Sequence, residues 1–324
     1  MTAAGILSSV RGKRALVIGD ICLDRWCIYD PSLAEPSRET GIPRIAVIET
    51  SVTPGAAGTV ANNLVALGAE VEVVGVLGED GFGFELVGAL ERGAIGSKNA
   101  VRSSLMPTFT YTKLINGATG EEDRPRVDFV FTQPVPPEVE RAVLAGVRQA
   151  WRRNNVVLVS DQAETHLGGI VTSRVRELIG ELAAEDPRRV VWVDSRMRPE
   201  LFRNVTLKCN QDEAAAAMSR CTGSDLRRHT AAPLVVITKG KEGALLIHAG
   251  GEDLIPTTPV ANPVDICGAG DSFSAGAALA LASGASPAEA VFFGNLVASI
   301  TIMKRGTGTA SPAEVLRAAS RLSS

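Results

Sequence analysis

The sequence predicts an α/β protein with a mainly parallel central sheet and helices on both faces. Short runs of β-branched and aliphatic residues read as buried strands, and a longer segment of helical pattern follows each of them. Because strands that alternate with helices form parallel sheets covered on both sides, this order gives the fold class. The predicted strands are residues 15–19, 71–77, 156–160, 190–194, 205–208 and 234–238.

Composition limits the size and class of the protein. The chain has 324 residues, of which 45% are hydrophobic and 21% are charged, as in folded globular proteins. This length suits one large α/β domain or two small ones. No stretch has the composition of a dividing linker, so we expect a single domain over residues 1–324.

Charge and cysteine content argue against several classes of partner. The formal net charge is -3, and no cluster of Lys and Arg would attract nucleic acid. The five cysteines are odd in number and scattered, which predicts reduced thiols. The amino terminus lacks a secretion signal, and the most apolar stretch, residues 275–282, is too short to cross a membrane. We therefore expect a cytoplasmic protein with neither nucleic-acid nor membrane partners.

Two segments interrupt the alternation of strands and helices. Residues 29–53 are rich in Pro, Ser and charge around a short strand-like run at 44–49. Residues 108–115 and 126–131 have the pattern of a hairpin around a polar tip. We expect these segments, about residues 29–53 and 108–131, to form a small β-flap that serves as a lid over one edge of the sheet.

Two helix starts are well marked near the carboxyl end. Ser286 and Ser311 are each followed by Pro and, three residues after the Ser, by Glu. This order puts Ser at the N-cap, Pro at the first helical position and Glu at the third. Helices should therefore begin at Pro287 and Pro312.

Polar residues and glycines follow the predicted strands, at the edge of the sheet where parallel sheets bind ligands. Any one of them could simply form a turn or a helix cap, but together they predict a binding rim. The sequence has no G-x-x-x-x-G-K-[ST] motif, and no G-x-G-x-x-G follows the first strand, which argues against a Walker-type NTPase and a Rossmann dehydrogenase. The rim residues are Asp20, Asp24, Gly78, Asp80, Asp161, Asp194, Asn210 and Gly240.

The segment 262–273 carries the clearest chemical signal. Gly268, Ala269 and Gly270 run into an apolar helix expected at 272–282, so free backbone N–H groups should form a phosphate cradle at its N-terminus. A carboxylate beside that cradle repels phosphate, which makes Asp271 a poor anion ligand. It fits a base that takes the proton of an attacking hydroxyl during in-line phosphoryl transfer. The alternative is that Asp271 only caps the helix.

The segment resembles the carboxy-terminal signature of the ribokinase/PfkB carbohydrate kinase family, whose core is D-[TX]-x-G-A-G-D. Residues 74–83 resemble the family's V-G-x-x-G-x-D-x-x-G, and matching motifs follow in order along most of the chain. The resemblance implies a ribokinase-like fold, ATP and Mg²⁺ as cofactors, K⁺ as a possible further one, and Asp271 as catalytic base. It implies that Asn210 and Glu213 organise Mg²⁺ through water and that Asp265 lines a monovalent-cation site. The nucleotide-binding residues it implies are Asn210, Glu213, Thr238, Lys239, Gly240, Gly243 and Asn295.

Near the amino terminus the chain most resembles the heptose-phosphate kinase branch of this family. Residues 19–26 are similar to its G-D-x-x-L-D-R-Y and residues 54–64 to its P-G-G-A-A-N-V-A. This resemblance implies a sugar phosphate, such as a heptose 7-phosphate, as substrate. It also implies a lid that is often shared in a homodimer. The expected substrate-binding residues are Asp20, Asp24, Gly55, Asn63 and Arg196.

Three departures from the branch keep other substrates open. Ala56 replaces a glycine, Thr59 an asparagine, and Glu164 a lysine that could hold an anionic sugar. Arg38, Lys113, Arg126 and Arg196 could supply that charge instead, or could be solvated surface residues. The alternatives are a kinase of an unphosphorylated sugar or nucleoside, and a catalytically silent sugar-binding protein. Cys267, beneath the anion loop, reads as a small filler residue.

Overall fold

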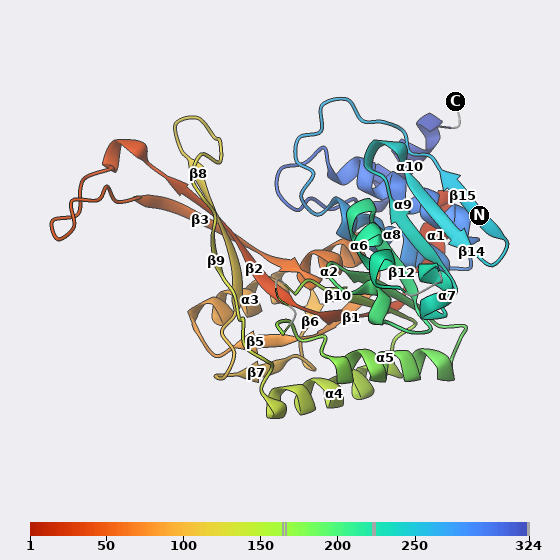
Figure 1. The fold of residues 1–324 in the computed structure, drawn as a ribbon. Coiled ribbons are helices and arrows are strands. Elements are labelled where there is room, and N and C mark those ends of the chain that lie inside the picture. The colour runs from red at the N-terminus through yellow and green to blue at the C-terminus, as the bar shows by residue number, and fades with distance from the viewer. Residues whose placement is uncertain (164, 166, 222–224, 323–324) are drawn as a thin grey trace.

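A nine-stranded sheet runs through the centre of the protein (Figure 1). The computed structural model describes residues 1–163, 165, 167–221 and 225–322. Neighbouring strands are parallel from β13 to β6, whereas β14 and β15 add an antiparallel edge. The order across the sheet is β15 (Gly251–Ile255), β14 (Ala244–His248), β13 (Val235–Thr238), β12 (Thr206–Asn210), β11 (Val190–Ser195), β10 (Val156–Asp161), β1 (Arg14–Gly19), β4 (Glu70–Val74) and β6 (Ile95–Gly96).

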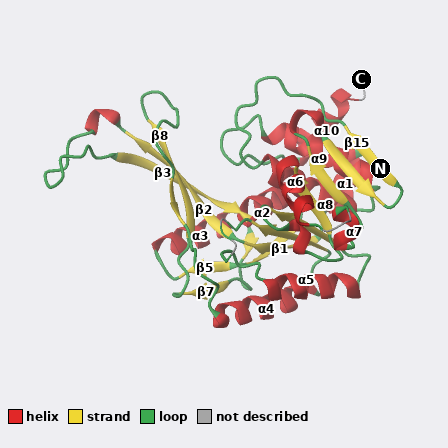
Figure 2. Cartoon of the chain, in the orientation of Figure 1, coloured by secondary structure: helices red, strands yellow, loops and turns green. Residues whose placement is uncertain are grey.

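Helices cover both faces of this sheet, as predicted (Figure 2). Successive residues of a strand point to opposite faces, so Ala15 and Val17 of β1 enter one core while Leu16 and Ile18 enter the other. The first core is closed by α1 (Ala3–Val10), α2 (Ala57–Ala66), α3 (Gly81–Arg92), α8 (Ala269–Ala282), α9 (Pro287–Thr301) and α10 (Pro312–Leu322). The second is closed by α4 (Pro137–Trp151), α5 (Ser173–Glu185), α6 (Gln211–Arg220) and α7 (Leu226–Thr230).

The predicted strands are present, with two differences. The run 71–77 is broken at Gly75: β4 ends at Val74, and β5 (Val76–Gly78) leaves the main sheet to pair with β7 (Val101–Ser103). A Cβ at residue 75 would lie 2.6 Å from the carbonyl oxygen of Gly19, so the absence of a side chain at Gly75 lets the two segments pass this closely. The expected α-helix is also missing after three strands: β1 runs directly into another strand at Ile21, and the 3-10 turns η2 (Pro199–Leu201) and η3 (Gly240–Glu242) follow β11 and β13.

A second sheet of four strands projects from one edge of the main sheet (Figure 1). Its order is β3 (Val47–Ala56), β2 (Ile21–Tyr29), β8 (Phe109–Asn116) and β9 (Val127–Phe129). We call these strands, with the loop between β2 and β3 that carries η1 (Pro31–Leu33), the lid sheet. The predicted hairpin of β8 and β9 is present.

The expected boundary of the flap at residue 29 was wrong, because all of β2 belongs to the lid sheet and pairs with both β3 and β8. The strand-like run expected at 44–49 was misplaced as well. β3 starts at Val47 and continues through polar residues to Ala56, because β2 supplies an antiparallel partner along its whole length.

Both marked helix starts are confirmed. The Ser286 side chain accepts a hydrogen bond from Glu289 N, and the Glu289 carboxylate accepts one from Ser286 N. Ser311 and Glu314 form the same reciprocal pair at α10. None of the helices in the described part of the chain combines the length and apolarity needed to cross a bilayer.

Candidate active site

The N-terminus of helix α8 lies at the carboxyl end of the parallel strands and carries free backbone donors. Gly268 is the N-cap, with a φ of 77° that glycine adopts without strain, so the helix begins at Ala269 rather than at 272. Ala269 N already donates to the Ile266 carbonyl at 3.2 Å. Gly270 N and Asp271 N have no acceptor among the described residues. The open part of the cradle is therefore shifted one residue toward Asp271.

Two cavities meet at this turn of helix. The smaller one, of about 190 Å³, is lined by Gly268 and Asp271, and the larger one, of about 680 Å³, by Ala269 and Gly270. The larger volume lies in the range of pockets that hold nucleotide-sized ligands. A group held at the turn is therefore within reach of molecules in both cavities.

The smaller cavity combines acidic and basic side chains from the main sheet and the lid sheet. Asp271 comes from α8 and Arg196 from the loop after β11, whereas Asp24 and Lys113 come from the lid sheet and Arg126 directly precedes β9. Of the predicted substrate residues, Asp24 and Arg196 line this cavity. Three cations named as alternatives to a missing lysine therefore lie here: Lys113, Arg126 and Arg196.

Gly55, Asn63 and Asp20 do not line the smaller cavity. A Cβ at Gly55 would lie 2.3 Å from Asp24 Oδ1, so this glycine leaves room for the Asp24 carboxylate. Asn63 is buried in α2, where its amide donates to the Thr59 carbonyl at 3.0 Å. Their expected link to the sugar came from the resemblance to the heptose-phosphate kinase branch.

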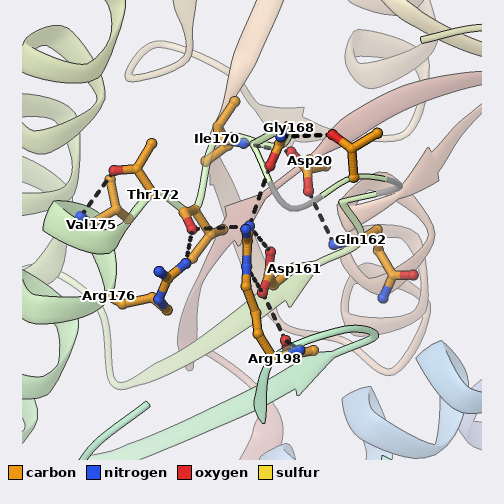
Figure 3. Close-up of polar contacts among 12 residues, drawn as sticks. Asp20, Asp161, Gln162, Gly168, Ile170, Thr172, Val175, Arg176 and Arg198 are labelled. Atoms are coloured by element: carbon orange, nitrogen blue, oxygen red, sulfur yellow. Dashed lines mark hydrogen bonds and ion pairs between the residues drawn. The ribbon is translucent and has the colours of Figure 1, made fainter. Parts of the chain in front are cut away.

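Asp20 holds a loop of the cavity wall instead of facing the cavity. Its two carboxylate oxygens accept hydrogen bonds from Gln162 N at 3.0 Å and Ile170 N at 2.7 Å (Figure 3). Burial and the nearby Asp161 raise the pKa of Asp20 to about 7. Gln162 lines the smaller cavity, so Asp20 acts on that wall through the backbone.

A buried ion pair supports the same loop. Arg198 binds Asp161 through Nε and Nη2, at 3.0 and 2.8 Å, and its Nη2 also donates to the Gly168 and Val171 carbonyls (Figure 3). Ser195 Oγ donates to the Asp161 carboxylate at 2.7 Å. Glu164, where the branch has lysine, lies in this loop but outside the described residues.

The electrostatic surroundings of Asp271 suit a base that works near neutral pH. Burial and the charge of Asp194 raise the pKa of Asp271 to about 7, against the opposing effect of Lys208. Burial also raises the pKa of Asp24, to about 6. A general base is most effective when its pKa lies close to the working pH.

Lys208 and Asp194 form a buried ion pair that sequence analysis missed. Lys208 Nζ donates to Asp194 Oδ2 at 2.7 Å, and the two residues are direct partners across β12 and β11. Asp194 was predicted only as a residue of the rim, and its side chain binds Lys208. The sequence did carry one signal for this pair: Lys208 is a charged residue in a predicted buried strand, close before the rim residue Asn210.

The larger cavity gathers most of the predicted nucleotide residues. Thr238, Gly240 and Gly243 reach it from the turn between β13 and β14, Asn210 from the end of β12, and Asn295 from α9. Lys239 is not among its lining residues, but Lys241 is. Glu213 also lies outside the lining and forms a capping box with Asn210.

Two further positions named from the sequence, Asp265 and Ala56, border the start of α8 and the smaller cavity, respectively. Asp265 accepts hydrogen bonds from Cys267 N at 2.9 Å and Gly306 N at 3.0 Å, which ties the loop before α8 to the loop after α9. Ala56, where the branch has glycine, has a φ of 50°, in a region that side chains rarely adopt. Ala56 and Thr59 both line the smaller cavity, so two of the departures alter its surface.

Comparison with known proteins adds three findings. The family of pfkB carbohydrate kinases matches residues 148–314, just over half of the chain. The chain is 29% identical to the bifunctional protein HldE of Bradyrhizobium diazoefficiens and 32% identical to that of Caulobacter vibrioides, over 96% and 95% of its own length. It spans only 64% of the length of either relative.

Solved structures share the fold. The ribokinase of Thermotoga maritima matches with a TM-score of 0.67 and 21% identity, over 94% of this chain and 99% of that one. Phosphofructokinase-2 of Escherichia coli, solved in complex with substrates and products, matches with a TM-score of 0.70 and 21% identity, over 97% and 100%. At such identities the likeness concerns the fold.

Proposed function

We propose, on the premise that this chain belongs to the pfkB family of carbohydrate kinases, that it transfers the γ-phosphoryl group of ATP to a hydroxyl of a sugar phosphate of the heptose 7-phosphate class. The observation that carries the proposal is the turn 268–271, which opens to a nucleotide-sized cavity on one side and to a smaller polar cavity on the other. The acceptor sugar occupies the smaller cavity and ATP the larger one.

The transfer follows from the groups at that turn. Asp271 takes the proton of the acceptor hydroxyl as its oxygen bonds to the γ-phosphorus, and the bond from that phosphorus to the β,γ-bridging oxygen breaks. Gly270 N and Asp271 N, with the helix dipole, stabilise the negative charge without having to reorganise. Closure of the lid sheet excludes water, which otherwise competes as acceptor.

A magnesium ion fits this site only if phosphate oxygens of the nucleotide complete the ligands that the protein offers. The described residues contain no cluster of three or more side chains able to hold a metal. Mg²⁺ is commonly held by one or two carboxylates together with phosphates and water. Glu213 suits this role because only Oε2 is used in its cap, and burial, with Asp194, raises its pKa. When bound, the ion neutralises phosphate charge, and Asn210 and Glu213 would hold it through water.

The phosphorylated substrate is favoured by the three cations of the smaller cavity. Arg196 lies in the loop after β11 of the main sheet, Lys113 in β8 of the lid sheet and Arg126 just before β9, so a phosphate bound among them would link the two sheets. A free sugar or nucleoside is the second candidate, because two of these cations have acidic partners. Lys113 lies 3.6 Å from Glu122, and Arg126 lies 2.7 Å from Asp128.

The same resemblance extends to assembly and to a monovalent ion. We propose a homodimer through the lid sheet, whose surface exposes several apolar side chains. Asp265 is proposed to lie beside a K⁺ ion, where it already joins the two loops that border the cradle. The exposed apolar residues of the lid sheet and its β2–β3 loop are Leu33, Ile42, Ile45, Val47, Ile48, Val127 and Phe129.

The test is ADP release from Mg-ATP with free sugars and their phosphates in matched pairs, including a heptose 7-phosphate. Turnover confined to the phosphorylated member supports the proposal, provided that Asp271→Asn abolishes it. Arg196→Met should then raise KM for the sugar phosphate, with no such effect on a poorly used free sugar. Turnover of a free sugar or nucleoside alone would support the second candidate as substrate. No turnover with any acceptor would overturn the proposed kinase activity.

A further inference from the structure

The side chain of Lys208 lies against the phosphate cradle, although it comes from the sheet. Its neighbours Leu207 and Cys209 pack into the core under α4 to α7, so the alternation of β12 directs Lys208 to the opposite face, beneath α8. The residue is 6% exposed and lines the larger cavity. A Cβ at Gly270 would lie only 2.9 Å from Lys208 Nζ. The ammonium group is therefore next to the helix turn that holds the free amides.

The hydrogen bonds of this ammonium group are incomplete. A lysine has three N–H donors, and Asp194 is the one acceptor that Lys208 has among the described residues. A buried donor without an acceptor is costly, which makes the spare donors of Lys208 suited to an anion in the cavity.

We propose that Lys208 is a catalytic residue that binds the transferring phosphoryl group beside Gly270, and that Asp194 is the positioning residue that holds its ammonium group. The inference rests on the proposed ATP-dependent transfer and adds a cation to a cradle otherwise made of backbone. Lys208 stays protonated throughout, while Asp271 takes the acceptor's proton and ADP leaves. A further effect follows, because Lys208 lowers the pKa of Asp271 and so favours its basic form.

A structural ion pair would look similar in the absence of nucleotide, so the test must separate the two roles. Arg198 and Asp161 offer a matched control: this pair is similarly buried, also has its carboxylate near the end of a main-sheet strand, and lines neither of the two cavities. Replacing either cation by Met should lower stability. Only the replacement of Lys208 should change how the protein distinguishes nucleotides by their phosphates.

The first measurement is calorimetric binding of ATP and AMP to the wild type, Lys208→Met and Arg198→Met. We expect Lys208→Met to weaken ATP binding about tenfold to a hundredfold, the size of one charge-assisted hydrogen bond, and AMP binding less than about threefold. Arg198→Met should leave the ratio of ATP to AMP affinity unchanged. If Lys208→Met fails to fold, Lys208→Met with Asp194→Leu replaces the whole pair by apolar groups, which proteins commonly tolerate.

The second measurement is the pH dependence of kcat/KM. Loss of the Lys208 charge should move the acidic limb to higher pH, since the pKa of Asp271 is then no longer lowered. An unchanged ratio of ATP to AMP affinity, together with an unmoved acidic limb, would overturn the role of Lys208 while the wild type still turns over sugar. A wild type that binds no ATP would instead overturn the proposed function itself.

Discussion

The main sheet and the lid sheet differ in how their strands are buried. β1 and β10 are buried along almost their entire length, whereas β3 is exposed from Val47 to Ser51 and β9 over all its residues. Burial of apolar surface stabilises the first sheet, and the second has little of it. The comparison teaches that the smaller cavity joins two unlike parts of the molecule: the proposed base, Asp271, belongs to a helix packed on the buried sheet, and Asp24 belongs to the more exposed lid sheet.

The lid sheet is nevertheless attached at a defined place. Phe129 of β9 contacts Phe82 of α3 with ring centroids 5.1 Å apart, and the Arg25 guanidinium of β2 lies 4.8 Å from the centroid of the Phe82 ring. These contacts join the outer strand and a central strand of the lid to the same helix. They leave the far end of the lid sheet, beyond Tyr29 and Val47, without support from the main sheet (Figure 1).

The largest effect is expected at the rigid side of the cavity. Asp271→Asn should lower kcat by about three orders of magnitude, because the acceptor hydroxyl loses its base, and should leave ATP affinity within a few-fold. Single-turnover kinetics and nucleotide binding measure the two quantities. A variant with kcat within a factor of a few of the wild type would contradict the role of Asp271.

Breaking a buried ion pair beside the main sheet should lower the free energy of unfolding far more than breaking an exposed ion pair of the lid sheet. Arg198→Met leaves the Asp161 carboxylate buried without its cation and should lower the free energy of unfolding by about 3 to 5 kcal/mol. Arg44→Met removes an exposed partner of Glu35 at 3.6 Å and should cost less than about 1 kcal/mol. Urea unfolding measures both, and equal effects would contradict the comparison.

The activity should fall as the pH drops below 7. Asp271 must be deprotonated to act, and its pKa is raised to about 7, so kcat/KM should lose about a factor of ten per pH unit on the acidic side. A profile that stays flat down to pH 5.5 would mean that the pKa of the base is not raised in the free enzyme.

The smallest effect on stability is expected at the exposed end of the lid sheet. Ile48→Asp should change the free energy of unfolding by less than about 0.5 kcal/mol, because the side chain is 61% exposed. It should nevertheless convert a lid-mediated dimer into a monomer in light-scattering measurements. Phe84→Asp, at an 82% exposed position on α3, is the control that should leave the dimer intact. A wild type that is monomeric at micromolar concentration would refute the dimer.

Sequence reasoning recovered the features that are encoded locally. Strands β1, β10, β11 and β13 are mainly apolar runs, and the starts of α9 and α10 are encoded by Ser, Pro and Glu within a few residues. Most of the lid sheet could not be found in this way. β2 and β3 are partly polar, and they exist as strands because residues from Tyr29 with Val47 to Ile21 with Ala56, far apart in the sequence, pair with one another.

The same limit applies to the site. The cradle and Asp271 lie in one short segment, so their roles could be inferred from it. The pairing of Lys208 with Asp194 depends on the register between β11 and β12, which no local pattern specifies. Asp20 has the opposite fault: its position after β1 predicts a ligand, but both its carboxylate oxygens accept backbone hydrogen bonds from a loop about 140 residues away.

The shared border of the two cavities has a consequence for inhibition. Residues of the turn 268–271 line both cavities, so one molecule with two linked halves could place a half in each. A sugar phosphate joined to adenosine through a short polyphosphate chain would gain from the high effective concentration of its second half once the first has bound. Such a two-headed compound would also hold the lid sheet closed and bring one fixed state within reach of crystallisation.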